Sequence, residues 1–246
     1  MKETQLNVRL IAHTQLADDF RREIEAEQRK YGFTDGQAVS LTAIRTCYSH
    51  LAPTEIIPAE AEKYFGKAAT DGKGGTDADR LFRHITGSGH TSTLEHVSFT
   101  FAITGVSRAL LAQLTRHRVG FSFSVQSQRY VRFGTHDRSG GATYVIPPSV
   151  WEKGADEVFK YAMSKAQELY DTLRGLGVPP EDARMVFPNA TACNLVMTAN
   201  LTALLNFYSK RRKGRGAQWE IAELAERIRE EVENVEPWTS PYFEGV

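Results

Sequence analysis

The densest cluster of chemically capable side chains begins at Arg116-His117-Arg118 and continues into a turn rich in serine and glutamine. The polar members of that turn are Ser122, Ser124, Gln126, Ser127, Gln128, Arg129 and Tyr130. Forked guanidinium donors match the oxygens of a phosphate group, and hydroxyl groups fill its remaining lone pairs. The alternative is a solvated helix end, where cations complement the helix dipole. The scarcity of large aliphatic residues in the turn favours a phosphate site.

A second cluster runs from Ser88 to His96 and contains two of three histidines that recur every six residues, at positions 84, 90 and 96. Metal-ligand pairs on a helix need a spacing of three or four, whereas a strand places every second residue on one face. His84 falls on an expected helix, so the three rings do not share a face simply, and we predict no metal site. His90 and Glu95 either brace a helix-to-strand turn or contact a ligand.

A third cluster follows Asn206, where five cations fall within the six residues 210–215. Such a run is typical of an RNA or anion patch, and equally of a solvated helix end and loop. Asn206 and the arginines one or two turns later could present amide and guanidinium groups to the same ligand.

Nucleophilic catalysis has little support in the sequence. Cys47 and Cys193 are the only cysteines, and each is expected to be a small apolar residue rather than a reactive thiolate. The chain has no Gly-x-Ser-x-Gly, no phosphate-binding loop ending in Gly-Lys-Ser/Thr and no Gly-x-Gly-x-x-Gly. A bound nucleotide would therefore lie in neither a Rossmann nor a P-loop cradle.

These clusters must be positioned by a mixture of strands and helices, separated by a glycine-rich loop at 68–76 and an irregular stretch at 119–146. Alternation predicts strands over 7–12, 96–103 and 192–199. Helical periodicity and capping residues predict helices over 15–31, 37–48, 77–87, 108–118, 149–174, 201–212 and 217–234, with a short one from Pro179. We expect a single α+β domain over residues 1–246, with a mixed central sheet and several helices.

The composition agrees with a compact protein. The 246 residues are 41% hydrophobic, and 30 basic side chains balance 30 acidic ones. Zero net charge argues against a general nucleic-acid binder, whose basic excess should be visible. No run approaches the roughly 18 apolar residues of a membrane span, and the N-terminus does not resemble a signal peptide. We expect a cytoplasmic protein with neither a membrane nor a nucleic-acid partner.

Taken in order, the clusters resemble the flavin-dependent thymidylate synthases. The signature of that family is Arg-His-Arg, seven or eight residues, then Ser, commonly continued as Ser-x-Arg-Tyr. Here it stands as Arg116-His117-Arg118, the eight residues 119–126, and Ser127-Gln128-Arg129-Tyr130. The resemblance spans roughly residues 40–225. Its further matches are His90-x-Ser92-x-x-Glu95-His96, Gln113, Glu181-x-x-Arg184, Asn200, Asn206 and Ala217-Gln218-Trp219-Glu220-Ile221.

The resemblance implies reductive methylation of dUMP to dTMP without a cysteine nucleophile. Methylenetetrahydrofolate would donate the carbon, and NADPH would reduce a bound FAD. The family is a homotetramer whose active sites form between subunits. Its α+β fold has no Rossmann cradle, in agreement with the missing glycine motif.

The resemblance also implies roles for individual residues. The residues expected near FAD are His90, Ser92, Glu95, Arg116, His117, Arg118, Asn200 and Asn206. Those expected at dUMP are Gln113, Arg116, Val125, Gln126, Ser127, Gln128, Arg129, Arg184 from another subunit, and Arg211. Two of these would act catalytically, Ser127 beside the uracil and Arg211 as the guanidinium that favours the anionic, electron-rich form of the base.

Two neighbouring residues, Arg211 and Arg212, are candidates for the base-activating arginine. In the family it follows the asparagine by five positions, which selects Arg211 after Asn206. Counting back from residues 217–219 selects Arg212, because this sequence has one extra residue between the landmarks. We prefer Arg211, since an insertion in the loop over 213–216 is easier to accommodate than one in a helix.

The same insertion leaves the role of Arg215 open. In the signature loop, several family members have Glu or Gln two or three residues before the serine, whereas this chain has Ser124-Val125-Gln126. Two other functions stay open on the residues alone. One is a flavin or nucleotide enzyme of another reaction, and the other is an RNA-binding module built on the two basic clusters.

Overall fold

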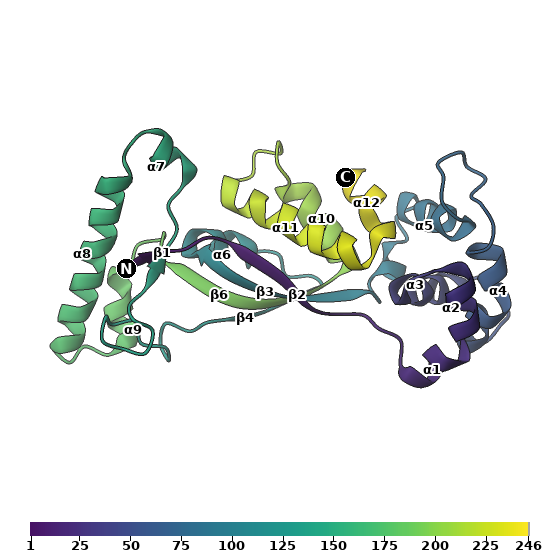
Figure 1. Ribbon diagram of the computed structural model, residues 1–246, viewed down its shortest axis with the longest axis horizontal. Helices are drawn as coiled ribbons and strands as arrows, with labels where there is room; N and C mark the ends of the chain where they lie inside the picture. The colour runs from purple at the N-terminus through teal and green to yellow at the C-terminus, as the bar shows by residue number, and fades with distance from the viewer. Residues whose placement is uncertain (246) are drawn as a thin grey trace.

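The fold is built on a four-stranded sheet, seen in a computed structural model that describes residues 1–245 (Figure 1). Its strands are β2 (Asn7–His13), β3 (Ser98–Ser107), β6 (Ala192–Asn200) and β4 (Phe121–Val125), in the order β2-β3-β6-β4. Phe99, Phe101 and Ile103 are fully buried on β3, as the alternation of the sequence requires for the face of a strand that packs on the core. The α+β class is therefore confirmed.

Every strand pair of this central sheet is antiparallel, so its predicted mixed character needs a correction. Strands β3 and β4, joined through α6 (Arg108–Leu114), run in the same direction, as expected for strands connected by a helix. They are not neighbours, however, because β6 lies between them and pairs with both. Parallel pairing is confined to a second sheet, in which β1 (Lys2–Glu3) pairs with β5 (Thr143–Tyr144).

The helices cover one face of the sheet and extend beyond both of its ends (Figure 1). Those beyond one end are α1 (Asp18–Glu23), α2 (Glu25–Tyr31), α3 (Asp35–Thr46), α4 (Ile56–Tyr64) and α5 (Asp77–Gly87). Those beyond the other end are α7 (Pro148–Glu152), α8 (Asp156–Gly175) and α9 (Pro180–Ala183). The face is covered by α10 (Leu201–Arg211), α11 (Trp219–Val235) and α12 (Ser240–Glu244). Four short 3₁₀ turns complete residues 1–245: η1 (Pro53–Glu55), η2 (Thr91–Leu94), η3 (Arg184–Val186) and η4 (Pro237–Thr239).

Two helices that the sequence predicts as continuous are each divided. The helix expected over 15–31 breaks at Ile24, which has φ −109° and ψ 10° and is fully buried. The helix expected over 149–174 is interrupted near Gly154, whose φ of +63° ends α7.

Helix α4 was not expected from the sequence. It contains Pro58 at its third position, where the missing backbone N–H would have had no partner in the helix.

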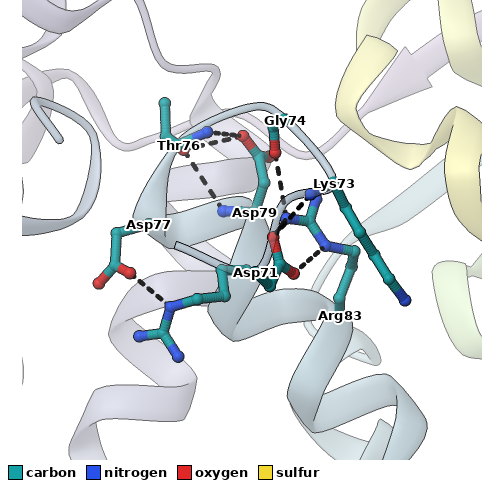
Figure 2. A network of polar contacts seen from close by, with 8 residues as sticks. Asp71, Lys73, Gly74, Thr76, Asp77, Asp79 and Arg83 are labelled. Atoms are coloured by element: carbon teal, nitrogen blue, oxygen red, sulfur yellow. Dashed lines mark hydrogen bonds and ion pairs between the residues drawn. The ribbon is translucent and has the colours of Figure 1, made fainter. Parts of the chain in front are cut away.

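The glycine-rich loop before α5 is held in place by polar contacts (Figure 2). Arg83 donates from Nε and Nη2 to the two carboxylate oxygens of Asp71 at 3.0 and 2.9 Å, and from Nη2 to the carbonyl oxygen of Gly74 at 3.1 Å. Thr76 caps α5 and forms a capping box with Asp79. The loop is therefore ordered by side chains of the helix that follows it.

The strand-to-helix junctions decide where the polar clusters meet. β3 runs directly into α6 at Ser107, and β6 runs directly into α10 at Asn200, each of which caps its helix. Asn200 pairs with Ser98 and lies at the end of the sheet where β4 begins, since Phe121 pairs with the neighbouring Ala199. Helix α6 and residues 115–120 therefore return the chain to the Asn200 end of the sheet.

Candidate functional site

A cavity of about 580 Å³ lies at the Asn200 end of the sheet, and we call it the signature cavity. It is lined by Thr91, Glu95, Arg116, His117, Arg118, Val119, Gly120, Phe121, Asn200, Thr202, Ala203, Asn206 and Lys210. Six residues expected at FAD therefore line the same cavity, although they come from three separate parts of the sequence. They are Glu95, Arg116, His117, Arg118, Asn200 and Asn206.

The approach of the Arg116–Arg118 segment to α10 depends on Gly120. Its φ is +73°, and a Cβ atom there would lie 2.7 Å from the Cβ of Ala203 and 2.9 Å from Nδ2 of Asn200. A larger residue would therefore be strained and would push this segment away from α10. Asn200 accepts a hydrogen bond from the backbone N–H of Ala203 at 2.8 Å through Oδ1, which leaves its Nδ2 group to face the cavity wall.

Helix α10 supplies one continuous face of the cavity through Thr202, Asn206 and Lys210. These residues are spaced by four, so they lie one above the other along the helix. Thr202 also donates to the carbonyl oxygen of Thr91 at 2.7 Å and so joins η2 to α10. Thr202 and Lys210 were not among the predicted site residues. Their helical spacing from Asn206 is the signal that could have identified them.

His117 is a neutral acceptor at the back of the cavity. Nε of Arg211 donates to Nε2 of His117 at 3.1 Å, so the imidazole proton resides on Nδ1. Burial, followed by the charges of Arg211, Lys210 and Arg116, lowers the pKa of His117 to about 4. The ring packs edge-on against Phe207, with centroids 5.0 Å apart. Near pH 7 the ring is therefore neutral, and it orients Arg211 by accepting its hydrogen bond.

The two candidate base-activating arginines have different partners. Nε of Arg211 donates to His117, which lines the signature cavity, whereas Arg212 is the C-cap residue of α10 and its backbone N–H donates to the carbonyl oxygen of Tyr208 at 2.8 Å. Within the described residues, Arg211 forms no ion pair with an acidic side chain. Its Nε is used by His117, so the two Nη groups are free to contact a ligand.

A second, smaller cavity of about 220 Å³ lies near the other end of β4, and we call it the Arg184 cavity. It is lined by Arg108, Gln128, Arg184, Met185, Phe187, Pro188 and Asn189. Nε of Arg184 donates to the carbonyl oxygen of Glu181 at 2.9 Å, and the Glu181 carboxylate pairs with Arg129 at 2.5 Å. Two residues expected at dUMP, Gln128 and Arg184, thus meet here rather than in the signature cavity.

The signature loop connects the two cavities. Val125 ends β4, and the backbone N–H of Gln126 donates to the carbonyl oxygen of Asn194 at 2.9 Å. The hydroxyl of Ser127 accepts from the backbone N–H of Arg129 at 3.2 Å. Five strand residues at about 3.3 Å each span roughly 17 Å, so the predicted nucleotide residues of one chain are divided between two places.

Comparison with known proteins identifies the family. Residues 31–238 match the family described as thymidylate synthase complementing protein. A flavin-dependent thymidylate synthase from Geobacter sulfurreducens is 40% identical over 205 residues, which is 82% of this chain and 80% of the relative. The chain belongs to this family. Membership confirms the resemblance found in the sequence and makes the chain an enzyme of the methyltransferase class.

Further relatives and a solved structure agree with this membership. Flavin-dependent thymidylate synthases from Clostridium tetani and Haloarcula marismortui are 34% and 38% identical, over 82% and 68% of this chain and 79% and 75% of the relatives. The crystal structure of a UMP/dUMP methylase, PolB from Streptomyces cacaoi, bound with 5-Br dUMP, has a TM-score of 0.72 at 20% identity. It covers 100% of this chain and 97% of that one, so the fold is shared over the whole length.

The signature cavity has the chemistry that a flavin dinucleotide requires of its site. Arg116, Arg118 and Lys210 bring three cations to its rim, and Glu95 is the one carboxylate in the lining. Guanidinium and ammonium groups suit a pyrophosphate, while the Asn200 and Asn206 amides can hydrogen-bond to flavin or ribose oxygens. The residues present therefore fit the cofactor class of the family.

Eight of the predicted site residues lie outside both cavity linings: Arg211, the loop residues Val125, Gln126, Ser127 and Arg129, and also His90, Ser92 and Gln113. His90 contacts the Tyr48 hydroxyl through Nδ1 at 3.2 Å, and Ser92 is exposed on η2. Gln113 is half-buried on α6, where Nε2 donates to the carbonyl oxygen of Ala109 at 3.4 Å. Contacts of these residues with a cofactor or substrate stay predictions.

Among residues 1–245, no three His, Cys, Asp or Glu side chains gather in a way that could hold a metal ion. No helix in the same part of the chain is both long and apolar enough to cross a membrane.

Proposed function

We propose that this enzyme converts dUMP to dTMP, with methylenetetrahydrofolate as the carbon donor and NADPH as the reductant of a bound FAD. The observation that carries the proposal is the signature cavity, which is lined by the Arg116–Arg118 segment, Asn200 and Asn206 and whose His117 accepts a hydrogen bond from Arg211. The methylene carbon is transferred to the pyrimidine, and two electrons from NADPH reduce it to a methyl group. When bound, the flavin supplies these reducing equivalents.

Arg211 activates the base in this proposal. Carbon five of uracil is a weak nucleophile until the ring becomes electron-rich. The free Nη groups of Arg211 would donate to the pyrimidine edge and favour its anionic form, while His117 holds Nε from behind. Each unit by which the pKa of the uracil falls corresponds to about 1.4 kcal/mol of differential stabilisation. The neutral His117 adds no competing positive charge beside the guanidinium.

The remaining predicted residues bind and orient the nucleotide. Arg116 and Gln113 would hold dUMP together with the loop Val125–Arg129, with Ser127 beside the uracil. Arg184 would come from another subunit. The separation of Arg116 and Arg184 into two cavities of one chain supports a shared site, because a second copy can bring its Arg184 cavity against the signature cavity of the first. A homotetramer with sites between subunits is part of the proposal.

The visible absorption spectrum of the purified protein tests the proposal. We expect a flavin spectrum that bleaches under anaerobic NADPH, responds to dUMP, and is followed by formation of dTMP when methylenetetrahydrofolate is added. A protein that cannot be loaded with FAD, or a loaded protein that makes no dTMP, would overturn it.

In this proposal neither cysteine acts as a nucleophile, so both single serine variants should stay active. Cys193 is 3% exposed, donates to the carbonyl oxygen of Val106 at 3.5 Å, and has a thiol whose pKa is raised by burial. Cys47 is exposed at the end of α3 and lines neither cavity. We expect Cys47→Ser and Cys193→Ser to retain most of the wild-type kcat for dTMP formation. A folded variant without turnover, with circular dichroism as the check on folding, would contradict the thiol-free mechanism.

A further inference from the structure

A third hollow, which we call the arginine hollow, has no role in the chemistry described above. It measures about 450 Å³ and lies in the loop between β4 and β5, lined by Tyr130, Val131, Arg132, His136, Asp137, Arg138 and Ser139. Arg132, His136 and Arg138 have exposed side chains. Within residues 1–245, none of these three forms an ion pair with a carboxylate.

The loop does not need its cations to stay ordered. Side chains of α8 bind its backbone: Nε2 of Gln167 donates to the carbonyl oxygen of Phe133 at 2.8 Å, and Oε1 of Gln167 accepts from the backbone N–H of Ala142 at 2.9 Å. The carboxylate of Asp171 accepts from the backbone N–H and the hydroxyl of Thr135, both at 3.1 Å. The hollow is therefore shaped before any ligand arrives.

The one acidic side chain in the lining is already used by the loop itself. Asp137 accepts from the backbone N–H of Gly134 at 2.8 Å through Oδ2. The hydroxyl of Ser139 donates to the carbonyl oxygen of Arg132 at 2.8 Å and so closes the turn that carries Arg132 and Arg138 to the same hollow. Two guanidinium groups and an imidazole thus line one hollow whose single carboxylate, Asp137, bonds the backbone of the loop, an arrangement that favours an anionic ligand.

The hollow directly continues the signature loop. Tyr130 follows Arg129, lines the hollow, is 79% exposed, and has the guanidinium of Arg129 over its ring at 5.5 Å. A second substrate bound beside the nucleotide at the loop Val125–Arg129 could therefore extend over Tyr130 into the hollow. The phosphates of dUMP and FAD have other cations available in the signature and Arg184 cavities. Among the anionic groups of the proposed ligands, only the glutamate carboxylates of the folate have not been assigned a cationic side chain.

We propose that the arginine hollow binds the carboxylates of an oligo-γ-glutamate tail on the folate substrate, an inference that rests on the proposed function. Several carboxylates on a flexible chain suit a wide, exposed hollow with two separate guanidinium groups, which can each pair with a different carboxylate. A phosphate of a nucleotide is the alternative source of negative charge at the same residues.

The FAD-loaded enzyme with dUMP tests this proposal through two forms of the carbon donor. We expect the KM for triglutamyl methylenetetrahydrofolate to lie on the order of tenfold below that for the monoglutamyl form, the equivalent of about 1.4 kcal/mol. In the double variant Arg132→Gln/Arg138→Gln the ratio of the two KM values should fall towards one, chiefly because the triglutamyl KM rises. Lys153→Gln, which removes an exposed cation after α7, is the matched control and should keep the wild-type ratio.

A binding measurement separates this inference from the proposed function. Calorimetric titration with unreduced pteroyl-monoglutamate and pteroyl-triglutamate requires no turnover. Tighter binding of the triglutamate by the wild type than by the double variant supports the hollow even if no dTMP forms, in which case only the proposed reaction fails. Equal KM and equal affinity for the two forms in the wild type would overturn the inference. So would a double variant that keeps the preference, or one whose defect lies in the KM for dUMP.

Discussion

Replacing Arg211 by alanine is expected to lower kcat for dTMP formation by roughly 10²–10³-fold or more while FAD stays bound, as is typical when one preorganised donor to developing charge is removed. The guanidinium is fixed by its Nε–H to His117, and its Nη groups are free of acidic partners within the described residues. FAD binding should persist, because Arg116, Arg118 and Lys210 still line the cavity. Stopped-flow reduction and product analysis, read beside the visible spectrum, measure the two effects separately.

Arg212→Ala is the matched control for this prediction. Arg212 is the next residue in the chain and the C-cap of α10, but His117 accepts its hydrogen bond from Arg211 and not from Arg212, so the loss of the Arg212 side chain should affect stability more than kcat. Arg211→Lys keeps the positive charge without the planar fork, and it should recover only part of the rate. A near-normal rate in Arg211→Ala combined with a dead but folded Arg212→Ala would show that the register of the base-activating arginine is shifted by one.

Six of the thirteen residues that line the signature cavity could be predicted, because short segments of the sequence carry them. Arg116, His117 and Arg118 are consecutive, and Asn206 lies on a helix whose periodicity is visible in the sequence. What the sequence did not show is the partnership between segments. The hydrogen bond from Arg211 to His117 joins residues 94 positions apart, and it follows from α10 packing behind the start of β4.

The division of the predicted dUMP residues between two cavities could not be predicted from the sequence. Arg184 and Gln128 occupy a cavity of their own because β4 carries the signature loop away from the Arg116–Arg118 segment. Alternation and capping residues predict the separate elements, but not that β6, which begins at Ala192, inserts between β3 and β4. Strand order depends on contacts between distant segments, and local propensity does not encode them.

Replacing Glu220 by alanine should lower the free energy of unfolding by about 2–4 kcal/mol, because it leaves buried donors without an acceptor. Glu220 is 2% exposed, and its carboxylate accepts from the backbone N–H of Ser107 at 2.7 Å and from the Ser107 hydroxyl at 2.5 Å. The same hydroxyl accepts from the backbone N–H of Leu110 and so caps α6, the helix that leads to Arg116. Urea unfolding followed by circular dichroism measures the loss.

Glu220→Gln is the control that keeps the size and one acceptor of the side chain. The pH dependence of its free energy of unfolding, compared with that of the wild type, tests the role of burial. Burial raises the pKa of Glu220 above its ordinary value of 4.5, so the folded state holds this proton more tightly than the unfolded state. The resulting stabilisation is complete below pH 4.5 and is lost as the pH rises through the folded-state pKa. The wild type should therefore lose stability relative to Glu220→Gln as the pH rises above about 4.5. A constant difference between the two proteins across that range, or an alanine variant as stable as the wild type, would show that the Glu220–Ser107 contact does not hold α11 against the start of α6.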